Sequence, residues 1–230
     1  MRSTRLILFD IDCTLMRTDG AGMRALRRAL LEVLGVVRED QVMPDGQTDP
    51  NIVRQLLKSQ GIPPSLWPGY EREVLEAYPP LLAEELDRSR SRLEPGVQEL
   101  LEHLAQDERF HLGVLTGNLE VTARLKLDLF ELNPTFPVGA FGSDCADRNR
   151  LGPVALERAR RHYQEDYALN HIWIVGDTPK DVAVARALGG RALAVATGSW
   201  SRPALEESLP DACLDNLSSL ERVLEILHMA

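Results

Sequence analysis

The chain has 230 residues, with 26 Lys and Arg against 35 Asp and Glu, so its formal net charge is −9 with neutral His. This acidic balance argues against a nucleic-acid binder held by phosphate contacts, because such domains carry a basic surplus. The content of 44% hydrophobic and 27% charged residues excludes intrinsic disorder and collagen-like repeats, and the length suits one large domain or one domain with a modest insert.

The first predicted element is a strand at residues 6–9, a short run of apolar residues. Similar runs follow at residues 112–115, 172–175 and 192–195. Short continuous apolar runs are typical of strands that are buried on both faces of a sheet.

Residues 17–93 contain no convincing strand, but they show helix patterns at 23–34, 52–57 and 74–86. The stretch 61–64 and the pair Pro79-Pro80 punctuate these patterns. We expect an inserted all-helical cap subdomain at residues 17–93.

Helix patterns at 96–104, 119–130, 153–161 and 181–188 alternate with the later strands. This alternation predicts an α/β fold, a doubly wound, Rossmann-like parallel sheet formed by residues 1–16 and 94–230.

Two carboxylates, Asp10 and Asp12, follow the first predicted strand. Ligands of an open parallel sheet bind beyond the carboxyl ends of its strands. The two acids repel each other unless a cation or a shared proton intervenes, and Mg²⁺ is the natural cation for such ligands. The alternative is an ordinary strand end followed by an Asx-type turn.

A second polar cluster, Thr116-Gly117-Asn118, follows the strand at 112–115. A hydroxyl, a flexible glycine and an amide at the start of a helix offer donors to an anion. The same residues are also common helix caps and turn residues.

A third cluster follows the strand at 172–175 and contains Asp177 and Asp181. Asp177 leaves the strand end and Asp181 lies one turn further, so both can face the edge that carries Asp10 and Asp12. Helix capping explains part of this composition, but it does not explain four acids converging on one edge.

These motifs, taken in order and spacing, resemble the haloacid dehalogenase-like hydrolase superfamily, and within it the phosphoglycolate-phosphatase-like members. The likeness rests on Asp10-Ile11-Asp12-Cys13-Thr14, Thr116-Gly117-Asn118 and Gly176-Asp177-Thr178-Pro179-Lys180-Asp181. It spans nearly the whole chain, since the helical insert is similar to the small helical cap of that superfamily.

The resemblance implies a phosphatase that uses an aspartyl-phosphate intermediate. Asp10 is then the nucleophile and Asp12 the general acid and base. Mg²⁺ is expected at Asp10, the backbone carbonyl of Asp12, Asp177 and Asp181, the last directly or through water. Thr116 and nearby backbone N–H groups, Gly117 and Asn118 among them, are expected to bind the phosphoryl oxygens.

The sequence departs from the family pattern at one position, because residues 143–153 lack the usual Lys. Arg148 or Arg150 would supply the positive charge, although guanidinium and ammonium groups are not equivalent. Lys126 is a third candidate, because it falls on the apolar stripe of the helix at 119–130; its alternative is a stem that reaches solvent.

The expected partner is a small phosphorylated metabolite, with neither nucleic acid nor membrane, and the chain is expected to be a monomer or homodimer. Its three cysteines form no disulfide or zinc pattern, and residues 6–11 are too short an apolar stretch for a signal peptide, so a cytoplasmic location is expected. Two alternatives stay open: a phosphomutase of the same fold, and a degenerate, non-catalytic binding member.

Overall fold

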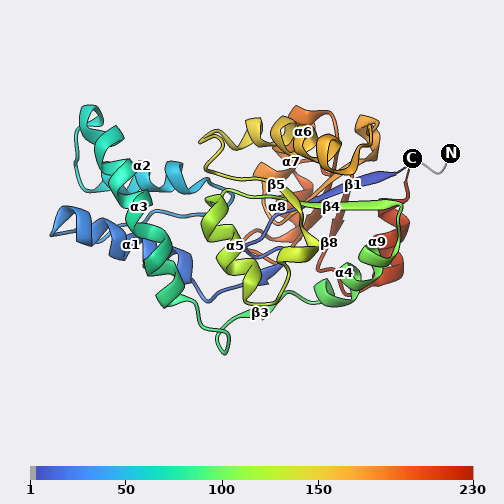
Figure 1. Cartoon of the computed structure of the whole chain (residues 1–230), viewed down its shortest axis with the longest axis horizontal. Coiled ribbons are helices and arrows are strands. Elements are labelled where there is room, and N and C mark those ends of the chain that lie inside the picture. Colours follow the sequence, from blue (N-terminus) through green and yellow to red (C-terminus); the bar gives the residue numbers. More distant parts are fainter. Residues whose placement is uncertain (1–3, 230) are drawn as a thin grey trace.

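The computed structural model describes residues 4–229, and a six-stranded parallel sheet with the order β5-β4-β1-β6-β7-β8 organises most of them (Figure 1). The strands of this sheet are β1 (Arg5–Phe9), β4 (Phe110–Leu115), β5 (Val138–Ala140), β6 (Ile172–Gly176), β7 (Arg191–Val195) and β8 (Ala212–Leu214). The predicted doubly wound α/β class is therefore confirmed.

The central strand β1 is apolar throughout because both of its faces are covered. Ile7 and Phe9 join the core on one face, whereas Leu6 and Leu8 join the core on the other. The helices that cover the first face are α4 (Val97–Gln106), α5 (Glu120–Asp128) and α9 (Leu220–Leu227). Those that cover the second are α6 (Leu151–Tyr163), α7 (Pro179–Leu188) and α8 (Arg202–Glu206).

A separate group of helices lies beside the sheet and is called the helical unit below (Figure 1). It consists of α1 (Ala21–Leu34), α2 (Asp49–Ser59), the 3₁₀ turn η1 (Pro64–Leu66) and α3 (Trp67–Glu85). These helices enclose their own apolar cluster. An antiparallel ribbon of β2 (Met16–Arg17) and β3 (Arg92–Leu93) joins the helical unit to the sheet.

Three features of the fold depart from the sequence-based expectations. The three-residue strands β5 and β8 carry too few residues to show a pattern. Short strands also occur at both ends of the insert, as the β2–β3 ribbon. Helix α3 runs through Pro79 and Pro80, although each proline removes a helix N–H. Its buried residues on either side of the prolines, Tyr78 and Leu82, pack in the core of the helical unit and offset that loss.

The strand register brings the predicted motifs to one edge of the sheet. Phe9 of β1 lies beside Val114 of β4 and Val175 of β6. The segments that follow these three strands therefore emerge next to one another. Among the helices of residues 4–229, none is long and apolar enough to cross a bilayer.

Candidate active site

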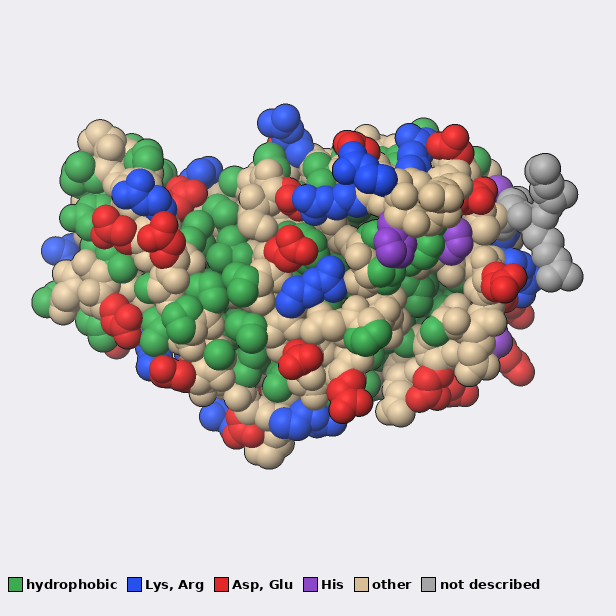
Figure 2. Space-filling view, in the orientation of Figure 1, with side chains coloured by type: hydrophobic (Ala, Val, Ile, Leu, Met, Phe, Trp, Pro, Cys, Tyr) green, Lys and Arg blue, Asp and Glu red, His purple; other side chains and the backbone are tan. Residues whose placement is uncertain are grey.

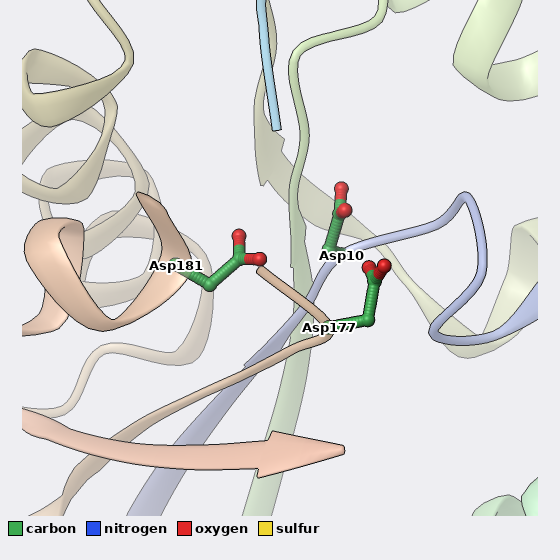
Figure 3. A group of neighbouring side chains, drawn as sticks. All are labelled: Asp10, Asp177 and Asp181. Carbon is green, nitrogen blue, oxygen red and sulfur yellow. The ribbon is translucent and has the colours of Figure 1, made fainter. Parts of the chain in front are cut away.

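Three carboxylates meet where β1 and β6 end. Asp10 follows β1, Asp177 follows β6 and Asp181 lies in the first turn of α7. One oxygen from each lies within 4.8 Å of the others, and all three residues are buried. Figure 3 shows Asp10 and Asp177 side by side, with Asp181 reaching toward them from its helix. The predicted convergence of these acids is thus present in the geometry.

Burial and mutual repulsion disfavour the charged forms of these acids. Burial raises the pKa of Asp177 to about 9, helped by the neighbouring charges of Asp181 and Asp10. Burial also raises the pKa of Asp10 to about 6, against the opposing effect of Arg148. A hard divalent cation prefers oxygen ligands of this kind and would offset the repulsion. The donor set therefore fits a divalent metal ion.

Two glycines and a threonine make room for these carboxylates and hold them. A Cβ on Gly198 would lie 1.9 Å from Asp177 Oδ2, and a Cβ on Gly176 would lie 2.4 Å from Asp181 Oδ2. Thr14 Oγ1 donates to Asp177 Oδ1 at 3.0 Å. Thr14 belongs to the first sequence motif, but a threonine there does not by itself predict a hydrogen bond to Asp177. No sequence motif predicted a role for Gly198.

Asp181 combines the capping role and the charged role that the sequence left open. Its Oδ2 accepts from Thr178 N at 3.0 Å and from Thr178 Oγ1 at 2.7 Å, which forms a capping box at the start of α7. Its Oδ1 accepts from Arg148 at 2.5 Å. Both oxygens of Asp181 are already bonded, unlike a carboxylate that is free to bind a metal ion directly.

Arg148 is the basic side chain next to Asp10. It lies in the 3₁₀ turn η3 (Arg148–Arg150), and its Nη2 is 3.2 Å from Asp10 Oδ1 and 2.5 Å from Asp181 Oδ1. Its Nε is buried without a hydrogen-bond partner in the described chain, so one donor is unused. Arg150, the other arginine candidate, is exposed and lies outside the cavity lining.

Lys126 of α5 contacts Asp12 instead of Asp10. Its Nζ is 2.7 Å from both Asp12 carboxylate oxygens and 2.7 Å from Asn118 Oδ1. Asn118 Nδ2 donates to Asp12 Oδ2 at 2.8 Å. Partial burial would raise the pKa of Asp12, but the charge and hydrogen bonds of Lys126, together with Asn118, hold it below its usual value. Lys126 is buried on the apolar stripe and does not extend to solvent.

Thr116 and Gly117 connect the site to the helical unit. Thr116 is fully buried, and its Oγ1 accepts from Asn118 Nδ2 at 2.7 Å, which leaves its own proton to donate. Gly117 O accepts from Asp49 N at 2.8 Å, and a Cβ on Gly117 would lie 1.9 Å from Gln47 O. Only glycine therefore allows the loop before α2 to approach this closely.

A cavity of about 430 Å³ lies between the sheet edge and the helical unit. Most of the predicted site residues line it, namely Asp10, Asp12, Thr116, Gly117, Asn118, Lys126, Arg148 and Asp177. Asp181 supports the site from behind this lining. Asp49 also lines the cavity; the segment 45–49 that contains it resembles the cap loop that approaches the substrate in related phosphatases, but Asp49 itself was not among the predicted site residues.

Comparisons with known proteins give a consistent result. No protein of curated function matches the chain significantly in sequence. A predicted phosphoglycolate phosphatase from Haemophilus somnus is 19% identical with a TM-score of 0.71, covering 96% of this chain and 98% of that one. A haloacid dehalogenase-like family hydrolase from Streptococcus pneumoniae is 22% identical with a TM-score of 0.67, covering 98% and 99%.

A β-phosphoglucomutase from Clostridium difficile is 13% identical with a TM-score of 0.73, covering 97% of both chains. At these identities, the solved structures establish the shared fold. The sequence model of the haloacid dehalogenase-like hydrolases matches residues 7–195, which include every motif of the site. The chain therefore belongs to the haloacid dehalogenase-like hydrolase family.

Proposed function

We propose that the protein is a Mg²⁺-dependent phosphatase that hydrolyses a small phosphate monoester, a phosphorylated metabolite. One observation carries the proposal: two carboxylates two residues apart have different partners. Asp10 faces the acid cluster and Arg148, whereas Asp12 faces Lys126 and Asn118. Paired carboxylates in different environments are suited to different steps of one reaction.

Asp10 is the nucleophile in this proposal. One of its oxygens forms a bond to phosphorus while the bond between phosphorus and the alcohol oxygen breaks, and Asp12 gives a proton to the departing oxygen. In the second step Asp12 takes a proton from water, whose oxygen attacks phosphorus and releases Asp10 and inorganic phosphate. Asp12 returns to its protonated form, so protons balance over the cycle. Because Lys126 lowers the pKa of Asp12 in the free chain, Asp12 takes its first proton from the monoanion of the bound phosphate ester.

Asp10 and Asp177 are the side chains that would hold Mg²⁺, with the carbonyl of Asp12 and with Asp181 acting through water. When bound, the ion would reduce the repulsion between an anionic nucleophile and an anionic phosphate. The oxygen-only donor set and the raised pKa of Asp177, about 9, support this assignment.

Arg148 is the basic residue that we assign to the phosphoryl group. It lines the cavity, and its Nη2 lies 3.2 Å from Asp10 Oδ1. Thr116 and the backbone of Gly117 would bind further phosphoryl oxygens, where fixed donors stabilise developing charge. Lys126 uses its three N–H groups on Asp12 and Asn118, so we assign it to the general acid and base.

The helical unit would act as the cap, because it lines one side of the cavity and Asp49 N of α2 donates to Gly117 O. A closed cavity excludes water while the aspartyl-phosphate forms. The similar structures include both a predicted phosphatase and a mutase, so inorganic phosphate release is the deciding readout.

The test is hydrolysis of p-nitrophenyl phosphate in Mg²⁺, followed by release of inorganic phosphate from a panel of metabolite monoesters. Asp10→Asn should lose at least about 10³-fold in kcat, because removal of a covalent nucleophile leaves only residual stabilisation. Its circular dichroism should match the native chain. Asp166→Asn, which changes an acid that is 92% exposed, is the control.

Unchanged turnover by Asp10→Asn would refute the proposal. Isomerisation of a sugar phosphate without net phosphate release would identify a mutase. Stabilisation by Mg²⁺ without turnover on the panel would identify a non-catalytic binding protein.

A further inference from the structure

The wall that the helical unit contributes to the cavity carries no positive charge. Within residues 21–85, the lining residues are Gly22, Met23, Leu26, Pro44, Asp45, Gly46, Gln47, Asp49, Ile52 and Tyr78. None of them is Lys or Arg, and two are acids. The part of a substrate that projects from its phosphate toward this wall therefore meets apolar side chains and carboxylates.

Asp49 is the deepest charged residue of this wall, with 5% of its surface exposed. Both donors that reach its carboxylate bond the same oxygen: Leu119 N donates to Oδ2 at 2.9 Å and Thr122 Oγ1 donates to Oδ2 at 3.3 Å. Oδ1 receives no hydrogen bond from residues 4–229. Oδ1 is nevertheless not one of the completely buried, unpaired side-chain atoms in that range, so it keeps some accessible surface. Because Asp49 lines the cavity, this oxygen faces the cavity.

The position of Asp49 places this oxygen beside the leaving-group end of the site. Its backbone N–H donates to Gly117 O at 2.8 Å, and its carboxylate is anchored at Leu119. Asn118, the residue between these two anchors, donates to Asp12 Oδ2 at 2.8 Å. An alcohol whose oxygen takes a proton from Asp12 therefore leaves into the cavity that Asp49 also lines.

We propose that Asp49 is a specificity-determining residue that selects phosphate monoesters whose alcohol carries a hydroxyl or ammonium donor, and that it disfavours a second anionic group at that position. This inference rests on the proposed phosphatase function. A buried acceptor that stays unpaired with the wrong substrate costs more than the same acceptor in water, which is how such sites discriminate.

Arg17 and Arg92, the two basic residues of the cavity lining that bond neither Asp10 nor Asp12, do not reverse this preference. Both lie on the β2–β3 ribbon, outside the helical unit. Arg17 is paired with Glu94 at 2.5 Å, and Arg92 is exposed, so its charge is screened by solvent and salt.

The test uses four two-carbon phosphate monoesters of similar size: ethyl, 2-hydroxyethyl, 2-aminoethyl and carboxymethyl phosphate. The kcat/KM of each is measured with the full-length native chain, Asp49→Asn and Asp45→Asn in Mg²⁺. For each substrate, dividing the kcat/KM of the variant by that of the native chain cancels the intrinsic reactivity of the leaving alcohol. Asp45→Asn is the matched control, since it also removes an acid from the same wall, one that is paired with Ser199.

We expect the native chain to favour the hydroxyethyl or aminoethyl ester over ethyl and carboxymethyl phosphate by roughly tenfold or more, the effect of one charged hydrogen bond. Whichever of these two esters has the higher kcat/KM shows whether a hydroxyl or an ammonium group is the preferred donor. An Asn at position 49 can keep its oxygen on Leu119 and turn its amide N–H₂ to the cavity, so Asp49→Asn should lose the preference and gain relative activity on carboxymethyl phosphate. Asp45→Asn should keep the native ranking.

A native preference for carboxymethyl phosphate, a flat native series, or an equal loss on all four esters in Asp49→Asn would overturn the inference. If Asp49→Asn fails to fold, the native series alone decides, since a donor preference supports the proposal and its absence refutes it. Turnover of p-nitrophenyl phosphate with a flat series refutes only this inference. Absence of turnover on every phosphate refutes the proposed function together with it.

Discussion

Arg148 and Lys126 are two buried basic residues that the fold directs to two different carboxylates. Arg148 bonds Asp10 and Asp181, and Lys126 bonds Asp12. Each acid of the Asp10–Asp12 pair therefore has its own cation. This division lets one carboxylate serve as a nucleophile while the other exchanges protons, which a single shared cation would not allow.

Replacement of Arg148 tests this division at the residue scale. Arg148→Met leaves Asp10 and Asp181 buried without their partner, and loss of one partner of a buried ion pair costs about 3–5 kcal/mol. We expect a loss of that order in the free energy of unfolding, measured with urea in the presence of EDTA. We also expect kcat/KM to fall by at least about 10²-fold, as for the loss of one charged donor. Arg148→Lys should recover part of both losses.

A native-like kcat/KM in Arg148→Met would show that another cation serves the phosphate. The matched control is Arg161→Met, which removes the 2.8 Å surface ion pair with Glu157 and should cost at most about 1 kcal/mol.

The sequence predicted the convergence of Asp10, Asp177 and Asp181, but it also placed the Asp12 carboxylate with them, which instead faces Lys126, and it could not choose among the cations. The acids follow strands whose apolar runs are unmistakable, and parallel strands present their carboxyl ends together. Arg148 lies in a 3₁₀ turn, where no periodicity reports which of Arg148 and Arg150 points inward. Lys126 lies on a helix, so its buried face was predictable, but its partner Asp12 was not.

At the scale of elements, long apolar strands and amphipathic helices were predictable, and short or packing-dependent elements were not. The strands β1, β4, β6 and β7 follow from their composition, whereas β5 and β8 have three residues each. Helix α3 contradicts its own local signal at Pro79-Pro80, because contacts with the helical unit's core outweigh backbone preference. Contacts of this kind are not encoded in local sequence.

Asp49, whose carboxylate joins the start of α2 to Leu119 before α5, has a pH-dependent effect on the free energy of unfolding that can be measured. Burial raises the pKa of Asp49 to about 6, against an unfolded value of about 3.9. The folded state therefore binds more protons at Asp49 than the unfolded state between these values, so the contribution of Asp49 to stability is highest below about pH 4 and is lost as the pH rises through about 6. The difference between the two pKa values corresponds, by proton linkage, to a loss of about 2–3 kcal/mol in the free energy of unfolding.

Asp49→Asn removes this titration, and the difference in unfolding free energy between variant and native should shift in favour of the variant by that amount from pH 4 to pH 7.5. Urea unfolding at a series of pH values measures it, with Asp45→Asn as the comparison. A difference that stays constant with pH would show that Asp49 is ionised in both states across this range. A residue that lowers stability at neutral pH yet lines the cavity is typical of a functional position.

At the scale of the whole molecule, charges of opposite sign are interspersed on the surface, although the net charge of the chain is −9. The face in Figure 2 shows acidic and basic side chains close together. Among the described residues, exposed ion pairs such as Arg161 with Glu157, at 2.8 Å, join charges of opposite sign. The acid cluster of Asp10, Asp177 and Asp181 is instead buried between the ends of β1 and β6. Ion binding at that cluster should therefore stabilise the entire fold by linkage.

Addition of Mg²⁺ to metal-free protein should raise the thermal unfolding midpoint by roughly 5–10 °C at about 100 times its dissociation constant, the shift expected for a chain of this length. The pKa of Asp177 is about 9 in the metal-free site, so at neutral pH the ion must displace a proton. The shift should therefore grow from pH 6.5 to pH 8.5. Scanning calorimetry with EDTA and with Mg²⁺ measures it, and Asp177→Asn should lose most of the shift while Asp166→Asn keeps it. Equal shifts in Asp177→Asn and the native chain would place the ion outside this cluster.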